Sequence, residues 1–391
     1  MDVKRVLQEL IAISEQPETI ASVYLCTRWA DEHQREAVRV FLQDEGRRAL
    51  RLAPSEEARQ RLARTLSPIE SYVSGLVRQR HDGWATGVAL FSCAPIGFFR
   101  VIAGRMPFAP MEFKLGDRPY VLPMASTLGA APPLLFATVD AEGGSLVEVS
   151  CGVVDLEAHI ARPYPGAHAR GGWSQRRFER HLGALRERNL RAVAEPFMRV
   201  AEARVEALLF VVGQSGTVRA FEELLPERIG RRIVARLPQP PANGNAVHDL
   251  LTQAHPFVEQ AVRERHQQER DAALAKAARK ALGVAGVAAT LRALSEGSVH
   301  RLLVDRDYRA AGLVCQSCGA LFEGPGACAR CAGEGREVSF PEEIVRRAIA
   351  NDAEVSFLAP EIALPAGTRL AALLRHGARV PQGHVELSPS S

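Results

Sequence analysis

The sequence predicts a mixed α/β protein with three domains. Its 391 residues correspond to two or three domains at roughly 150 residues each. Strand-like apolar runs alternate with helical periodicities along the chain, which indicates sheets covered by helices. Hydrophobic residues make up 47% and charged residues 24%, an ordinary globular composition that argues against a disordered or collagen-like chain.

Residues 1–132 are predicted to form an N-terminal α+β domain. Helical periodicity runs through Asp31–Arg51 and again through Ser55–Gln79. Four short segments are rich in β-branched or aromatic residues and read as strands: Ala21–Cys26, Ala85–Cys93, Ile96–Ile102 and Tyr120–Pro123. The proline-rich residues 130–133 mark the expected boundary.

Residues 133–282 are predicted to form the middle domain. Three consecutive antiparallel strands are expected at Leu134–Val139, Leu146–Cys151 and Val153–Ile160. The turn Glu142-Gly143-Gly144 would join the first two strands as a hairpin. A long helix from about Ser174 to Arg204, a buried strand at Ala207–Val212 and a charged helix at Ala246–Leu282 complete the domain.

Residues 283–391 are predicted to form a small α/β/α sandwich with an inserted cysteine-rich segment at 313–335. Three helices are expected at Val287–Ser295, Pro341–Asn351 and Arg369–Arg375. Two strands are expected at Val299–Val304 and Glu354–Leu358.

Four cysteines have the spacing of a metal site. Cys315 and Cys318 form one Cys-x2-Cys pair, and Cys328 and Cys331 form a second. Zinc prefers four soft ligands in a tetrahedron, and a gap of two residues lets one tight turn present both thiolates. We therefore predict a structural zinc ion. Four free thiols or a redox pair are the alternatives.

Positive charge is concentrated in His159–Arg199, which contains nine arginines and three glutamates, whereas the whole chain carries a net charge of only +4. Gly171 and Gly172 let the backbone approach a ligand closely, and Trp173 can stack on a base. The start of the following helix favours phosphate through its free N–H groups. This pattern predicts a site for a polyphosphate backbone, with a solvated surface loop as the alternative.

Other function classes are excluded or weakly supported by the residues. None of the four lysines follows a glycine, so a Walker-type phosphate loop is excluded. Gly213-Gln214-Ser215-Gly216-Thr217 lacks the final glycine of a nucleophile elbow. The carboxylates that a two-metal nuclease would need are present, but we expect them in turns or on solvent faces: Asp140, Glu142, Glu148 and Asp155.

No membrane span is expected, and we predict a cytoplasmic protein. The uncharged stretch Pro119–Val139 has 21 residues, but it contains four prolines whose backbone could not be satisfied in lipid. The segment at residues 1–10 is not a secretory signal.

The segment Gly171-Gly172-Trp173-Ser174-Gln175-Arg176-Arg177-Phe178-Glu179-Arg180 resembles the catalytic loop of the archaeo-eukaryotic translation termination factors, whose pattern is Gly-Gly-Gln-Ser-x-x-Arg-Phe-x-Arg. The resemblance is strongest to the bacterial and archaeal release-factor-like proteins. It implies a variable N-terminal domain, a ribonuclease-H-like middle domain bearing the loop, and a pelota-like C-terminal domain with an inserted zinc ribbon.

This resemblance implies a ribosome-associated protein that hydrolyses the peptidyl-tRNA ester in termination or rescue. Gly171 and Gly172 would allow close approach, and Gln175 would position the water, while the RNA contacts would come from Arg170, Trp173, Arg176, Arg177 and Arg180. The chain departs from the pattern because Trp173 stands where the family has glutamine, and Gln175 lies two positions later.

The alternative is a non-catalytic ribosome-binding module of the pelota type, which recruits partner proteins through the C-terminal domain. Trp173 in the glutamine position is the feature that keeps this alternative open. The ribosomal state or codon that is recognised and the oligomeric state are not indicated.

Overall fold

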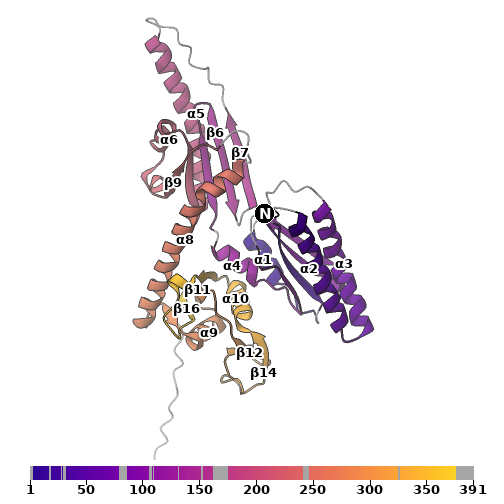
Figure 1. Ribbon diagram of the computed structural model, residues 1–391. Helices are drawn as coiled ribbons and strands as arrows, with labels where there is room; N and C mark the ends of the chain where they lie inside the picture. Colours follow the sequence, from indigo (N-terminus) through magenta and orange to yellow (C-terminus); the bar gives the residue numbers. More distant parts are fainter. Residues whose placement is uncertain are drawn as a thin grey trace, which may run out of the picture. The chain divides into compact units, whose positions relative to one another are not determined.

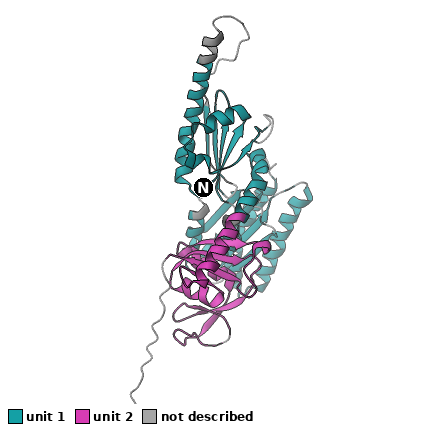
Figure 2. Cartoon of the chain, turned by 90° about the vertical axis from the view of Figure 1, so that its left-hand side faces the viewer, with its two compact units in different colours: residues 1–263 teal, residues 264–391 magenta. Residues whose placement is uncertain are grey.

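The computed structural model describes residues 3–16, 19–27, 29, 32–78, 86–104, 108, 110–130, 132–150, 153–161, 175–240, 246–324 and 326–375. The chain divides into two compact units, residues 1–263 and 264–391 (Figure 2). The mixed α/β class is as predicted, with four sheets among the described residues. The boundaries expected near 132 and 282 stay predictions.

The first sheet of unit 1 is antiparallel, in the order β3-β2-β1-β4. Figure 1 draws this part of the chain in indigo and violet, with the long helices α2 and α3. Its strands are β1 (Ile20–Cys26), β2 (Gly87–Cys93), β3 (Phe98–Gly104) and β4 (Glu112–Gly116). The helices of this part are α1 (Val3–Ile11), α2 (Glu32–Leu52), α3 (Glu56–Arg78) and α4 (Leu122–Ala130). One face of β1, which includes Val23 and Leu25, packs in a hydrophobic cluster with Leu42 of α2 and Ile69 of α3.

The strand expected at Tyr120–Pro123 is wrong. The N–H of Tyr120 donates to Ser22 Oγ, and the carbonyl of Tyr120 accepts from the Tyr24 hydroxyl, so both backbone groups bond to side chains rather than to a neighbouring strand. The helix α4 then begins at Leu122, with Pro123 in its first turn, where a missing N–H costs nothing.

The second sheet of unit 1 is mixed, in the order β7-β6-β5-β8-β9. Its strands are β5 (Leu134–Val139), β6 (Gly143–Ser150), β7 (Val153–Ala161), β8 (Leu208–Gly213) and β9 (Ile233–Leu237). Its helices are α5 (Gln175–Ala203), α6 (Ser215–Glu222), α7 (Glu227–Gly230) and the first part of α8 (Ala246–Ala278). The pairs β7-β6 and β6-β5 are antiparallel, whereas β5-β8 and β8-β9 are parallel.

Two hydrophobic clusters lie on the two faces of this sheet. Leu209 and Val211 of β8 pack with α5 and α6 through Phe197 and Phe221. The alternating residues Phe210 and Val212 pack with the first part of α8. The three expected strands of the meander and the long helix of this domain are confirmed within a few residues.

Unit 2 is built on a sheet in the order β10-β16-β11-β15, in which only β11 and β15 are parallel. The strands are β10 (Gly283–Ala285), β11 (Val299–Asp305), β15 (Glu354–Leu358) and β16 (Leu370–Leu374). The helices α9 (Val287–Ser295) and α10 (Phe340–Ala350) contact β16 and β15, respectively. The end of α8 supplies Ala273 to a cluster with Leu303 and Ala371.

The helix expected at Arg369–Arg375 is wrong, because this segment is the strand β16. Alanine and leucine favour helix locally, but here they pair antiparallel with β10 on one side and β11 on the other. Leu370, Ala371 and Ala372 are fully buried, and a short run that is apolar at consecutive positions suits a strand covered on both faces.

The cysteine-rich insert forms a small antiparallel sheet of its own, in the order β13-β12-β14. Its strands are β12 (Ala311–Cys315), β13 (Leu321–Phe322) and β14 (Gly335–Ser339). Gly312 of β12 faces the ring of Phe340, the first residue of α10, so closely that a Cβ on Gly312 would lie 1.7 Å from Cε1 of that ring. The insert is therefore fitted onto the start of α10.

Candidate functional site

The predicted catalytic loop lies between the edge strand β7, which ends at Ala161, and α5, which begins at Gln175. Arg170, Gly171, Gly172 and Trp173 lie outside the described residues. The other predicted residues of the loop, namely Gln175, Arg176, Arg177 and Arg180, fall within the first two turns of α5, where the backbone alone is described.

The helix α5 is one continuous element of 29 residues, despite Pro196 in its interior. Its described part extends past the end of the five-stranded sheet in Figure 2. One side of the helix is buried at Leu190, Val193 and Phe197. The solvent side continues the arginine-rich character of the sequence and exposes Arg188, Arg191 and Arg199.

Two polar side chains tie the loop-proximal half of α5 to the body of the domain. Arg186 Nη2 donates to the Thr217 hydroxyl at 2.7 Å, and Asn189 Nδ2 donates to the carbonyl of Ala141 at 3.1 Å. Asn189 is only 2% exposed. Neither residue carries a signal in the sequence, because an arginine and an asparagine in a charged helix normally face solvent.

The carboxylates considered for a nuclease have structural partners. Asp140 Oδ1 accepts from the N–H groups of Glu142 and Gly143, both at 2.8 Å, and so forms the β5-β6 turn. Glu148 is 6% exposed and pairs with Arg204 at 2.9 Å. Asp140 lies in a turn as expected, whereas the expectation of a turn or solvent-face position is wrong for Glu148, which is buried within β6 beside Arg204.

The segment Gly213-Gln214-Ser215-Gly216-Thr217 is the junction between β8 and α6, as its turn interpretation predicted. Gly213 has a φ of +153°, and a Cβ there would lie 2.5 Å from the carbonyl oxygen of Val139. The segment therefore needs glycine for close approach of β8 to β5.

The four cysteines of the insert come together as predicted from their spacing. Cys315, Cys318, Cys328 and Cys331 have their sulfur atoms within 4.8 Å of one another. The Sγ–Sγ distances are 3.4 Å between Cys315 and Cys331 and 3.6 Å between Cys318 and Cys328. Thiolates at about 2.3 Å from one tetrahedral zinc lie about 3.8 Å apart, so the set fits a metal ion.

The two Cys-x2-Cys turns repeat the same backbone pattern. The N–H of Gly319 donates to the carbonyl of Cys315 at 2.9 Å, and the N–H of Ala332 donates to that of Cys328 at 2.7 Å. Gly319 and Ala332 both have positive φ values, +70° and +57°. A Cβ on Gly333 would lie 3.1 Å from Cys315 Sγ, so this glycine lets the second turn approach the first.

The thiols of the cluster titrate together: although the N–H of Gly333 lowers the pKa of Cys331, hydrogen bonds with the other thiols raise it to about 12. The N–H of Cys318 points at Cys315 Sγ at 3.5 Å and lowers the pKa of this thiol to about 6, because a donor stabilises the thiolate. In the second turn the N–H of Arg330, two residues after Cys328, donates to Cys328 Sγ at 3.4 Å. Several thiolates this close repel one another unless a metal ion lies between them.

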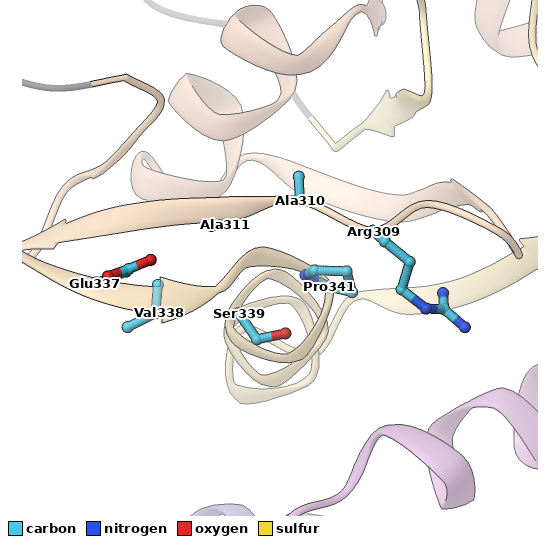
Figure 3. Close-up of a pocket in the computed structure, with 7 residues that line it drawn as sticks. All are labelled: Arg309, Ala310, Ala311, Glu337, Val338, Ser339 and Pro341. Atoms are coloured by element: carbon cyan, nitrogen blue, oxygen red, sulfur yellow. The ribbon is translucent and has the colours of Figure 1, made fainter.

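The insert also has an open groove of about 650 Å³ on β12 and β14, lined by Arg309, Ala310, Ala311, Glu337, Val338, Ser339 and Pro341 (Figure 3). Arg309 and Glu337 are the charged residues among those that line it. The groove holds no nucleophile with an adjacent base, so it does not compete with the loop as a catalytic site.

A family comparison decides the relationship of the middle of the chain. Residues 119–259 match the family described as bacterial archaeo-eukaryotic release factor family 10. This segment, which is less than half of the chain, is similar to that family. The matched segment contains the whole five-stranded sheet, the loop and α5, whereas the cysteine cluster lies outside it.

The solved structures that are similar to this chain share little sequence identity with it. The archaeal translation termination factor aRF1 is 16% identical, with 96% of this chain and 97% of that chain covered and a TM-score of 0.27. Archaeoglobus fulgidus Pelota is 13% identical, with 75% and 80% covered and a TM-score of 0.32. The structure described as ribosome-bound archaeal Pelota and ABCE1 is 14% identical, with 96% of this chain and 95% of that chain covered and a TM-score of 0.41.

No curated protein sequence matches the chain. Among the described residues, none of the helices combines the length and the apolar character that crossing a bilayer requires.

Proposed function

We propose that this release-factor-like protein acts on the ribosome and hydrolyses the ester between the nascent peptide and its tRNA. The observation that carries the proposal is the position of the Gly171–Arg180 motif within the family match. The motif leads into a 29-residue helix whose buried face fixes it on the sheet. A loop at the tip of such a helix can reach into RNA, and the loop and the helix start concentrate arginine.

Each residue of the motif has a separate task in this reaction. Gly171 and Gly172 let the backbone approach the ester, and Arg176, Arg177 and Arg180 bind RNA phosphates. Water adds to the carbonyl carbon, the bond to the tRNA 3′ oxygen breaks, and that oxygen takes up a proton. Gln175 orients the water but does not remove its proton, because an amide does not titrate near neutral pH.

Peptide release from purified ribosome–nascent-chain complexes tests the proposal. Gln175→Ala and Gly172→Val should each abolish release and leave the circular dichroism spectrum unchanged. Gly183→Ala and Gln214→Ala are matched controls, because Gly183 is exposed with open space around it and Gln214 is exposed at the start of α6. Release that persists in both loop variants would discard this mechanism.

Ribosome binding is tested separately by co-sedimentation at several salt concentrations. Replacing Arg176 and Arg180 by glutamate should weaken binding and reduce its salt dependence, since each lost phosphate contact lowers the slope by about one. Co-sedimentation without release would support the ribosome as partner and reject hydrolysis.

We further propose that the metal of the cysteine cluster is zinc with a structural role. All four ligand positions would be filled by sulfur, whereas a catalytic zinc normally keeps one position open. Metal analysis of the purified protein should give about one zinc per chain.

A further inference from the structure

The direction of α5 determines where its first residue lies, and the loop joins the helix at that residue. The first residue of the helix, Gln175, lies 14 positions before Asn189. At ~1.5 Å per residue this part of the helix is about 21 Å long, so a rotation of about 3° displaces its start by ~1 Å. Misplacement of a reacting group by about 1 Å can slow a reaction ~100-fold.

The described apolar residues of α5 are less completely buried before Leu190 than after it. The fully buried apolar residues lie from Leu190 onward, and they include Val193 and Phe197. Among the described residues before Leu190, Leu182 is buried with 9% exposure and Leu185 is half-buried. Among the described residues before Leu190, the direction of α5 is therefore set by Leu182 and Leu185 together with the polar contacts of Arg186 and Asn189.

Both polar contacts lie at the carboxyl ends of two neighbouring parallel strands. Asn189 bonds to Ala141, in the turn that follows β5, and Arg186 bonds to Thr217, in the first turn of α6 after β8. The two donors are one helical turn apart on the same face of α5. Each contact point is rigid in turn, because Asp140 bonds to the β5-β6 turn and Thr217 is 8% exposed.

Stability alone does not account for Arg186. Its Nε is buried without a hydrogen-bond partner among the described residues. An unsatisfied buried donor costs free energy, and an apolar side chain at this position would avoid that cost. Arg186 thus combines a donor that bonds to Thr217, Nη2, with a buried donor that does not bond, Nε.

We propose that Arg186 and Asn189 are positioning residues that fix the direction of α5 and thereby aim the Gly171–Arg180 loop. The expected effect on the rate of peptide release rests on the proposed function. The restraint on α5 itself can be measured without any peptide release.

Thr217 offers a test that leaves the loop and the helix unchanged in sequence. Thr217→Val removes the hydroxyl but keeps the shape, whereas Thr217→Ser keeps the hydroxyl. In single-turnover release we expect Thr217→Val to lower the rate at saturating protein about tenfold, with an unchanged half-saturating concentration. Thr217→Ser should restore the rate, and adding Thr217→Val to Arg186→Ala should slow release no further.

Hydrogen exchange tests the restraint on α5 without a release assay. Amides at 181–189 should exchange faster in Thr217→Val than in the parent protein, while those of β5 and β8 keep their protection. Thr252→Val is the matched control, because this exposed hydroxyl bonds to the His248 carbonyl of its own helix. Unchanged exchange at 181–189 in Thr217→Val overturns the inference, and so does release by this variant at the parental rate. A parent protein that releases no peptide rejects only the proposed function.

Discussion

At the scale of single residues, the positive φ of Ala332 is the clearest local conflict between side chain and backbone. Ala332 holds the place in the second cysteine turn that Gly319 holds in the first, and a Cβ is unfavourable in that conformation. Ala332→Gly should therefore stabilise the metal-loaded protein by about 1 kcal/mol in urea unfolding.

Gly319→Ala is the matched control for this prediction. A Cβ on Gly319 meets open space, so the substitution introduces backbone strain without a clash. It should destabilise the protein by a similar ~1 kcal/mol. Equal and unchanged unfolding midpoints in both variants would contradict the role given to this backbone conformation.

Tyr308 is a buried residue whose hydroxyl has no hydrogen-bond partner among the described residues. Burial raises the pKa of Tyr308 to about 12, with a smaller contribution from Glu323. The unfolded chain releases this proton near pH 10 but the folded chain does not, so this contribution to stability is complete below about pH 10 and is lost as the pH rises toward 12.

Tyr308→Phe should remove this alkaline loss. At neutral pH the variant should be at least as stable as the parent, because no hydrogen bond is sacrificed. Urea midpoints measured between about pH 8 and 11 should fall less steeply for the variant. Parallel curves for the two proteins would show that Tyr308 does not titrate during unfolding.

At the scale of elements, the C-terminal end of α5 is capped by one side chain from a distant segment. Arg232, which precedes β9, donates to the carbonyls of Ala201, Arg204, Val205 and Ala207. Ala201 lies in the last turn of α5, whose carbonyls have no partner within the helix, and the other three acceptors lie in the turn that leads to β8. Arg232 therefore caps the helix and fixes this turn.

Arg232→Ala should destabilise unit 1 by about 1–3 kcal/mol in urea unfolding, because several acceptors lose a charged donor. Arg231→Ala is the control, since the Arg231 side chain is 75% exposed and pairs with Glu227 one turn away. It should change stability by less than about 0.5 kcal/mol. A similar loss in both variants would mean that the cap contributes nothing specific.

The elements also show where sequence patterns suffice. The strand Leu134–Val139 and the helix Val287–Ser295 are found with the predicted bounds, because long periodicities and β-rich runs flanked by turns are strong local signals. The segment at 370–374 becomes a strand only through pairing with β10 and β11, and local propensity cannot reveal a partner 66 or more residues away.

One candidate site could be predicted from the sequence, and two residues that hold the other could not. The cysteine cluster follows from spacing alone, since two short gaps place four thiolates around one point. Asn189 and Arg186 could not be predicted, because their importance comes from Ala141 and Thr217, which reach them only after the sheet has formed.

At the scale of the whole molecule, loss of the metal should destabilise the insert in unit 2 and leave the stability of unit 1 unchanged. Cys318→Ser should abolish stoichiometric metal binding and speed hydrogen exchange at 311–339, because thiolate–metal bonds hold the insert together. The strands of the five-stranded sheet should keep their protection. Cys93→Ser makes the same chemical change in a buried position of unit 1 and should leave the metal content unchanged.

The helix α8 has a consequence for how such a protein can evolve. Its residues Leu250 and Ala254 belong to the cluster on the five-stranded sheet, and Ala273 belongs to the cluster of unit 2. A junction at residue 263 would leave each cluster complete in its own unit, but it would fall within the continuous helix α8. A junction beyond Ala278 would instead take Ala273 away from the cluster of unit 2. We therefore expect exchanged modules among relatives to join near residue 263, where two helical segments must continue as one helix.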